Sequence, residues 1–114
     1  MLLNIYQNKI ISLVDARTNY IGLIQGNLEF FQGSRLFFKE YVDLQDPAEK
    51  LSYSFHYQDP DNHLIFRYDN AKHKPSLGYS DHKHIGDKIM PSDIPEIEQV
   101  ILEIINEHLV GCWY

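Results

Sequence analysis

The chain has 114 residues, of which 44% are hydrophobic and 23% are charged, and its formal net charge is −6. These values predict one domain, residues 1–114, that folds without a metal or a disulfide, and the acidic balance excludes a general polyanion binder. The single cysteine, Cys112, excludes an internal disulfide and a cysteine-pair zinc site. No apolar run approaches the ~18 residues of a membrane span, and the first ten residues lack a signal-peptide pattern. We therefore expect a cytoplasmic protein with no membrane association.

Residues 4–70 are predicted to form a meander of antiparallel strands. Residues 27–31 and 35–42 flank a Gln-Gly-Ser turn at 32–34, which indicates a hairpin. The register that places the larger apolar side chains on one face pairs Leu28 with Phe38 and Phe30 with Leu36.

Residues 51–58 and 63–70 predict a second hairpin, because both alternate between apolar and polar side chains. A turn closed by Asp59 and Asn62, with Pro60 between them, pairs Tyr57 with Leu64 and Phe55 with Phe66. A loop longer by two residues keeps the same faces and shifts the partners. In either register one face is apolar, and the other carries side chains that bind anions or exchange protons: Ser54, His56, Arg67 and Asp69.

The remainder is predicted to be a His- and Lys-rich loop, 70–91, followed by a helix over 93–110. Isoleucines recur there at three- and four-residue spacing. Asp93 and Glu96 have capping-box spacing, Pro95 falls in the first turn, and Gly111 ends the helix. The expected fold is α+β: an antiparallel sheet of about five strands with one C-terminal amphipathic helix on one face.

Residues 67–88 hold five basic and three acidic residues, whereas residues 92–114 hold five acidic residues and no Lys or Arg. Three interpretations of the histidines in this basic segment remain open: solvated loop residues, a metal site and an anion site. For a metal, His82 and His84 would act with His73 and with Asp81 or Asp69. Recognition of an anion is favoured, because imidazole exchanges protons near neutrality. We expect no metal and no cofactor.

The stretch YSFHYQDPDNHLIFRYDNAKH, followed by DHKHIGD, resembles the TumE family of small toxins from prokaryotic type II toxin–antitoxin modules. The resemblance covers roughly residues 20–108, with departures at Lys74 and Asp81, where a histidine is expected. It implies a toxin that is neutralised by a cognate antitoxin. Carried over residue by residue, it indicates His56, Arg67, Asp69, Asn70, His73, His82 and His84.

The residue types suggest the hypothesis of a metal-independent endoribonuclease. His56 and either His82 or His84 would be base and acid, Arg67 would hold the phosphate, and Asp69 would orient a histidine. The predicted phosphate-binding group is Arg67, Lys72, His73 and Lys83. Each residue also has a structural interpretation: His56 as a half-exposed sheet residue, and Arg67 with Asp69 as an ion pair.

The alternative function is a non-enzymatic module that binds protein or nucleic acid. A metal-dependent transferase or nuclease is a third. The expected partners are the antitoxin and RNA or the ribosome, and a homodimer is compatible with the sequence.

Overall fold

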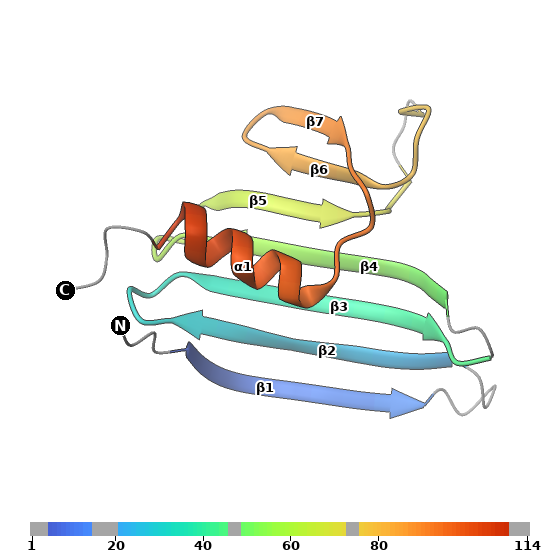
Figure 1. Ribbon diagram of the computed structural model, residues 1–114, viewed down its shortest axis with the longest axis horizontal. Helices are drawn as coiled ribbons and strands as arrows, with labels where there is room; N and C mark the ends of the chain where they lie inside the picture. Colours follow the sequence, from blue (N-terminus) through green and yellow to red (C-terminus); the bar gives the residue numbers. More distant parts are fainter. Residues whose placement is uncertain (1–4, 15–20, 46–48, 73–75, 110–114) are drawn as a thin grey trace.

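The structure is a computed structural model that describes the backbone of residues 5–14 and both backbone and side chains of residues 21–45, 49–72 and 76–109. The described residues form one antiparallel sheet in sequential order, followed by a single helix, α1 (Ile97–Glu107) (Figure 1). This confirms the α+β class. The strands are β1 (Ile5–Val14), β2 (Ile21–Phe30), β3 (Arg35–Asp43), β4 (Glu49–Gln58), β5 (Leu64–Asp69), β6 (His82–Ile85) and β7 (Lys88–Pro91).

The sheet has seven strands rather than about five, because β6 and β7 lie in the segment that was expected to be a loop. They form a hairpin whose two-residue turn, Gly86 and Asp87, joins the paired residues Ile85 and Lys88. Gly86 has φ 57°, the left-handed conformation that such turns require. The hairpin extends the sheet at β5, so two histidines of the basic segment occupy a regular strand.

The β2–β3 hairpin has a different register from the one expected. The Phe30 amide donates to the Ser34 carbonyl at 2.8 Å, so the loop is 31–33, and Leu28 pairs with Leu36 rather than Phe38. Gly33 has φ 97°, and a three-residue loop of this kind takes its left-handed residue at the last position. That requirement sets the register.

The β4–β5 hairpin follows the same rule. Its loop is 60–62, with Asn62 at φ 68° in the last position, and Asp59 donates its amide to the His63 carbonyl at 2.9 Å. A β-bulge at Tyr57 and Gln58 shifts the pairing of β4 with β5 by one further residue. The predicted turn closed by Asp59 and Asn62 is therefore wrong. The strands have the other register considered, in which the loop is longer by two residues and His56 pairs with Arg67.

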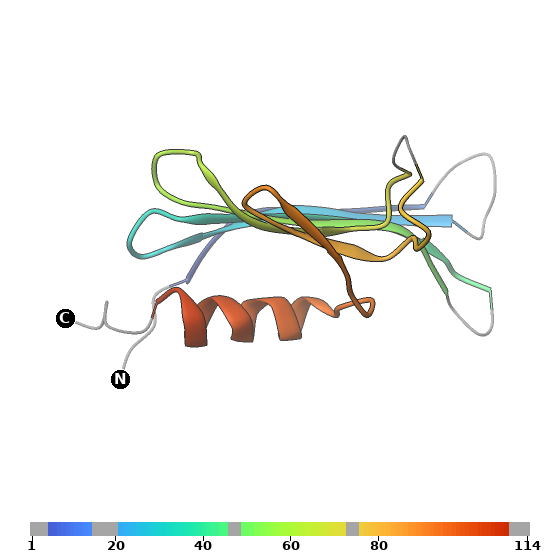
Figure 2. The ribbon, with the colours of Figure 1, turned by 90° about the horizontal axis from the view of Figure 1, so that it is seen from above.

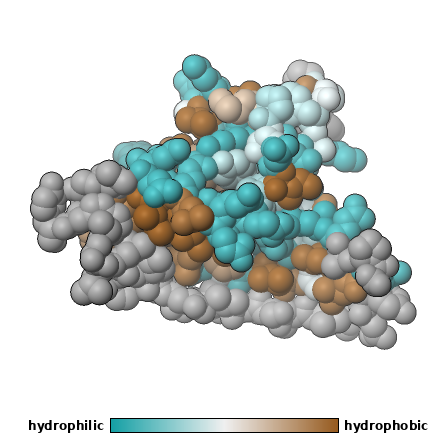
Figure 3. Space-filling view, viewed as in Figure 1, coloured by the Kyte–Doolittle hydropathy of each residue, from teal (hydrophilic) through white to brown (hydrophobic). Residues whose placement is uncertain are grey.

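The helix lies against one face of the sheet, and the described part of the chain places no helix on the other face (Figure 2). The core between helix and sheet contains Tyr53, Phe55 and Tyr57, as the alternation predicts. Within α1, Val100 and Ile104 are fully buried, and most of the predicted isoleucine stripe is partly buried around them. Seen from the helix side, hydrophilic and apolar side chains alternate over the surface (Figure 3).

The helix begins later than the sequence suggested. Glu96 is its N-cap and forms a capping box with Gln99, instead of Asp93 with Glu96. A helix that began after Asp93 would need helical backbone at Ile94, which the following proline disfavours. Pro95 precedes the helix, because the N-cap Glu96 after it is extended, with φ −94° and ψ 157°. Gly111 lies outside the described residues. None of the described helices is long and apolar enough to cross a membrane.

Candidate functional site

The face of the sheet opposite α1, here called the open face, brings the predicted site residues together in two cross-strand rows. The first row runs across β3 to β6 through Phe37, His56, Arg67 and His84. The second row, beside it, runs through Lys39, Ser54, Asp69 and His82. Directly opposed side chains on antiparallel strands are neighbours. The five residues predicted to be catalytic therefore lie on three adjacent strands.

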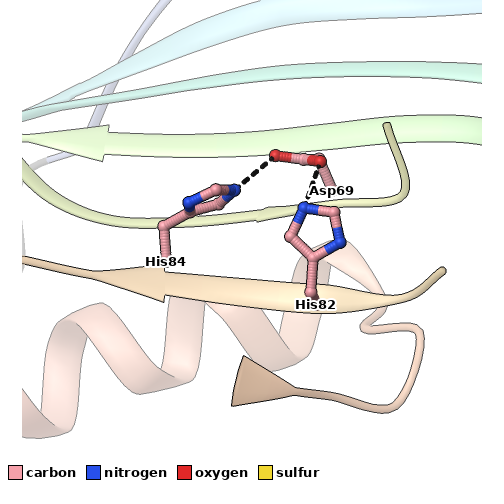
Figure 4. A group of neighbouring side chains, drawn as sticks. All are labelled: Asp69, His82 and His84. Carbon is pink, nitrogen blue, oxygen red and sulfur yellow. Dashed lines mark ion pairs between the residues drawn. The ribbon is translucent and has the colours of Figure 1, made fainter. Parts of the chain in front are cut away.

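Asp69 is the centre of this group, because its buried carboxylate contacts three basic side chains. Its Oδ2 is 2.9 Å from Arg67 Nε. Oδ2 is also 3.4 Å from His84 Nε2, and Oδ1 is 2.8 Å from His82 Nε2 (Figure 4). The amide of Ala71 also donates to Oδ1 at 2.9 Å. Burial alone raises the pKa of Asp69, but the Ala71 and Arg67 hydrogen bonds and the charge of His82 outweigh it, so the pKa lies below its usual value.

His82 is fully buried, and both of its ring nitrogens face acceptors. Nε2 faces the Asp69 carboxylate, and Nδ1 lies 2.7 Å from the Ser80 carbonyl oxygen. Each of these contacts is a hydrogen bond when the facing ring nitrogen carries a hydrogen and donates it to the oxygen. His82 thus fixes the orientation of Asp69 from below the surface.

His56 has the opposite arrangement. Arg67 Nη1 lies 3.3 Å from His56 Nδ1, and a guanidinium can only donate, so Nδ1 is the acceptor. Nε2 then carries the hydrogen and donates to Gln58 Oε1 at 3.2 Å. Burial and the Arg67 charge lower the pKa of His56, and the Gln58 contact opposes them only in part. The lowered pKa favours the neutral imidazole, which is the form that can accept a proton.

Asp69, His82 and His84 could also hold a divalent metal, since one ligand atom from each lies within 4.8 Å of the others. The hydrogen bond from His82 Nδ1 to a backbone carbonyl is one that metal-bound histidines commonly make. However, the Arg67 guanidinium already contacts the same carboxylate at 2.9 Å. A divalent cation there would be repelled by Arg67, and it would have to break the contact between His82 Nε2 and Asp69 Oδ1.

A groove of about 520 Å³ lies on the open face beside this group. It is lined by two cations, Lys39 and Arg67, together with amide, hydroxyl and aromatic side chains. A second hollow shares Lys39, Ser54 and Arg67 with it and extends to Asp69. The groove therefore reaches the first row of residues from the β3 side.

Other residues of the predicted site lie elsewhere. Lys83 points to the helix face, because it alternates with His82 and His84, and its Nζ is 2.7 Å from Glu103 Oε2. Lys83 therefore lies on the opposite face of the sheet from Arg67. Lys72 is exposed in the loop after β5 and lines a separate hollow, and His73 lies outside the described residues.

Asn70 has a structural role, since its side chain accepts from the Tyr53 amide and donates to the Leu51 carbonyl. Sequence reasoning missed Phe37 and Lys39 as neighbours of the site. Their alternation with the buried Leu36 and Phe38 was the available signal.

The fold and this group of residues define a small α+β protein with a basic, histidine-containing groove on the open face of its sheet. The chain belongs to the TumE toxin family: the family model, described as Toxin TumE, matches residues 4–110. A toxin role follows from that membership, and toxin families of this kind imply an antitoxin partner in general. Comparisons with curated proteins and with solved structures gave no match.

Proposed function

We propose that this toxin is a metal-independent endoribonuclease whose acid–base pair is His56 and His84. The observation that carries the proposal is the cross-strand row in which Arg67 lies between these two histidines. Strands β4 and β6 both neighbour β5, and adjacent strands are ~4.8 Å apart, so the two histidine backbones are about 10 Å apart. A phosphodiester on the central guanidinium would have one imidazole on each side.

The environments of the two histidines suit opposite roles. Neutral His56 is prepared to accept a proton, and its Nδ1 becomes available once Arg67 turns its Nη1 hydrogen toward a phosphate oxygen. His84 lies beside the Asp69 carboxylate, which stabilises its protonated form and so makes it a donor.

In the proposed reaction, a ribose 2′-oxygen attacks the adjacent phosphorus and its proton passes to His56. The bond between phosphorus and the 5′-oxygen breaks, and that oxygen takes a proton from His84. Arg67 stabilises the charge on the pentavalent phosphorane. The products are a 2′,3′-cyclic phosphate and a 5′-hydroxyl. Asp69 and His82 are positioning residues that hold His84 and Arg67.

A non-enzymatic binding module is the alternative function. The observation in its favour is that the group is already internally paired: each buried side-chain nitrogen or oxygen among the described residues has a hydrogen-bond partner. In that case Arg67 and Asp69 would serve mainly to order the strand, and the groove would bind its target without proton transfer.

Growth arrest upon induction separates the two functions. For the ribonuclease, His56→Ala and His84→Ala should each abolish arrest, since a lost proton-transfer group costs about 10²–10⁴ in rate. Arg67→Lys should also be impaired, because an ammonium cannot fork a phosphate. For a binding module, single alanines would weaken arrest gradually.

The matched control is Lys88→Ala, an exposed cation at the β6–β7 turn, which should leave arrest unchanged. Lys50 is unsuitable as a control, because its Nζ is 3.0 Å from both Glu40 Oε1 and the Pro95 carbonyl. Full arrest by His56→Ala at normal expression would remove the acid–base assignment. Coexpression of the antitoxin should suppress arrest by every active variant.

A further inference from the structure

Phe37 begins the first row, next to the proposed catalytic residues, and it is the one apolar side chain of that row. Its neighbours in sequence, Leu36 and Phe38, are buried under the helix, whereas Phe37 is 36% exposed on the open face. Its ring centroid lies 6.2 Å from that of His56, at an interplanar angle of 66°. A large aromatic ring is therefore held on a central strand, in contact with solvent, next to the residue proposed to be the base.

The surroundings of Phe37 match a nucleotide in both charge and hydrogen bonding. The groove that it lines carries Lys39 and Arg67, and none of its described lining residues is acidic, although the whole chain has a net charge of −6. Three amide side chains line the same groove: Gln25, Asn27 and Gln58. Cations suit phosphates, amides can donate to and accept from base edges, and an exposed aromatic ring offers a stacking surface.

We propose that Phe37 forms a base-stacking subsite, and that the substrate is single-stranded RNA. This rests on the proposed ribonuclease function. A base stacked on Phe37 belongs to a nucleotide flanking the phosphate held by Arg67, because His56 lies between the two side chains in the same row. Lys39, two residues along β3 and on the same face, then contacts a neighbouring phosphate.

A double helix does not fit this arrangement. Bases within a duplex are stacked on one another, so they cannot place a face on an aromatic ring of the protein, whereas unpaired bases can. The subsite therefore selects loops, linkers and ends of RNA. Hydrogen bonds from the Gln25 and Asn27 amides to base edges would let the subsite prefer some bases over others.

Binding can be measured apart from cleavage with a short, fluorescently labelled 2′-fluoro RNA, which lacks the attacking hydroxyl. Fluorescence anisotropy should show that Phe37→Leu weakens binding of the single strand about ten- to 100-fold, the scale of one base–aromatic stack. Phe37→Trp should retain affinity. The matched control is Tyr79→Leu, an aromatic residue that is also 36% exposed but does not line the groove, and it should bind as the wild type does.

Two further probes sharpen the result. The same strand annealed to its complement should bind more weakly than the single strand. A strand with one abasic nucleotide should lose affinity for the wild type but lose little more for Phe37→Leu, because the stacking contact is already absent from that variant.

Equal affinity of the wild type and Phe37→Leu would overturn the proposal, and so would tighter binding of the duplex. So would a Phe37→Leu protein that binds RNA normally but no longer binds the antitoxin, since the groove would then be a protein-docking surface. If binding depends on Phe37 but natural RNA stays intact, the subsite stands and the ribonuclease function fails. If Phe37→Leu binds and cleaves RNA as the wild type does, the subsite fails and the ribonuclease stands.

Discussion

Asp69→Asn should destabilise the protein substantially and in a pH-dependent way. Asparagine has nearly the same shape but no charge, and its NH2 group would face at least one of the donors that now contact Oδ1 and Oδ2. Removing one partner of a buried ion pair typically costs about 3–5 kcal/mol. The Arg67 side chain is 37% exposed and can regain water, so we expect the lower end, about 3 kcal/mol.

For a protein of this size, a loss of about 3 kcal/mol corresponds to a fall in melting temperature of roughly 10–15 °C. The pKa of Asp69 is below its usual value in the folded state. Its contribution to stability is therefore complete above the unfolded-state pKa, near ~3.9, and is lost as the pH falls through the folded-state pKa. The difference between the wild type and Asp69→Asn should accordingly shrink below about pH 4.

Urea unfolding between neutral pH and about pH 3 measures both quantities. Asp87→Asn, an exposed carboxylate in the β6–β7 turn, is the control and should stay within about 0.5 kcal/mol of the wild type. A loss below about 1 kcal/mol for Asp69→Asn, or a loss that stays constant down to the lowest pH, would refute the view that Asp69 is the charged centre of the group.

Three other predictions concern separate parts of the molecule. Histidine NMR titration should give His56 a pKa below that of a free imidazole, because burial and the neighbouring guanidinium favour its neutral form. The stability that His56 contributes should be lost as the pH falls from the pKa of an unfolded-state histidine through the lower pKa of His56 in the folded protein. A double-mutant cycle with Lys83→Met and Glu103→Gln should show a coupling free energy of about 1 kcal/mol or more. The reason is that the 2.7 Å ion pair between Lys83 and Glu103 joins β6 to α1 and is largely shielded from solvent. Zero coupling would mean that the pair is only a surface contact. Gly33→Ala should lower the free energy of unfolding by about 1 kcal/mol or more, because φ at residue 33 is 97° and the new Cβ would lie 3.3 Å from the ring of Pro60. Asn62→Gly should be neutral or stabilising in the same thermal unfolding assay. Equal effects of the two changes would contradict the loop assignment.

The alternation of the β4–β5 hairpin was sufficient to predict which side chains share a face. Phe55 is buried and His56 lies on the open face, as the period of two requires. The strand partners were harder to predict, because they depend on where the left-handed residue falls in each loop. A glycine such as Gly33 indicates the left-handed position from the sequence itself, whereas Asn62 is recognised as left-handed only from its φ of 68°.

The β6–β7 hairpin was missed because each strand is only four residues long, and three of the four residues of β6 are polar. Only the Gly-Asp turn at 86–87 signalled it. This omission mattered for the site: with β6 placed beside β5, His84 pairs directly with Arg67, which a loop does not predict. Phe37, which is far from the other site residues in sequence, is joined to the site only by the order and the register of the strands.

Mapping the ends of cleaved RNA shows directly whether the toxin is a metal-independent ribonuclease. Purified toxin is incubated with a defined single-stranded RNA in excess EDTA, and the products are analysed for their terminal groups, with His84→Ala and Lys88→Ala alongside. The wild type and Lys88→Ala should produce 2′,3′-cyclic phosphate and 5′-hydroxyl ends, and His84→Ala should not cleave the RNA. Intact RNA from wild-type protein that arrests growth, or products with 5′-phosphate ends that form only when a divalent metal is added, would contradict it.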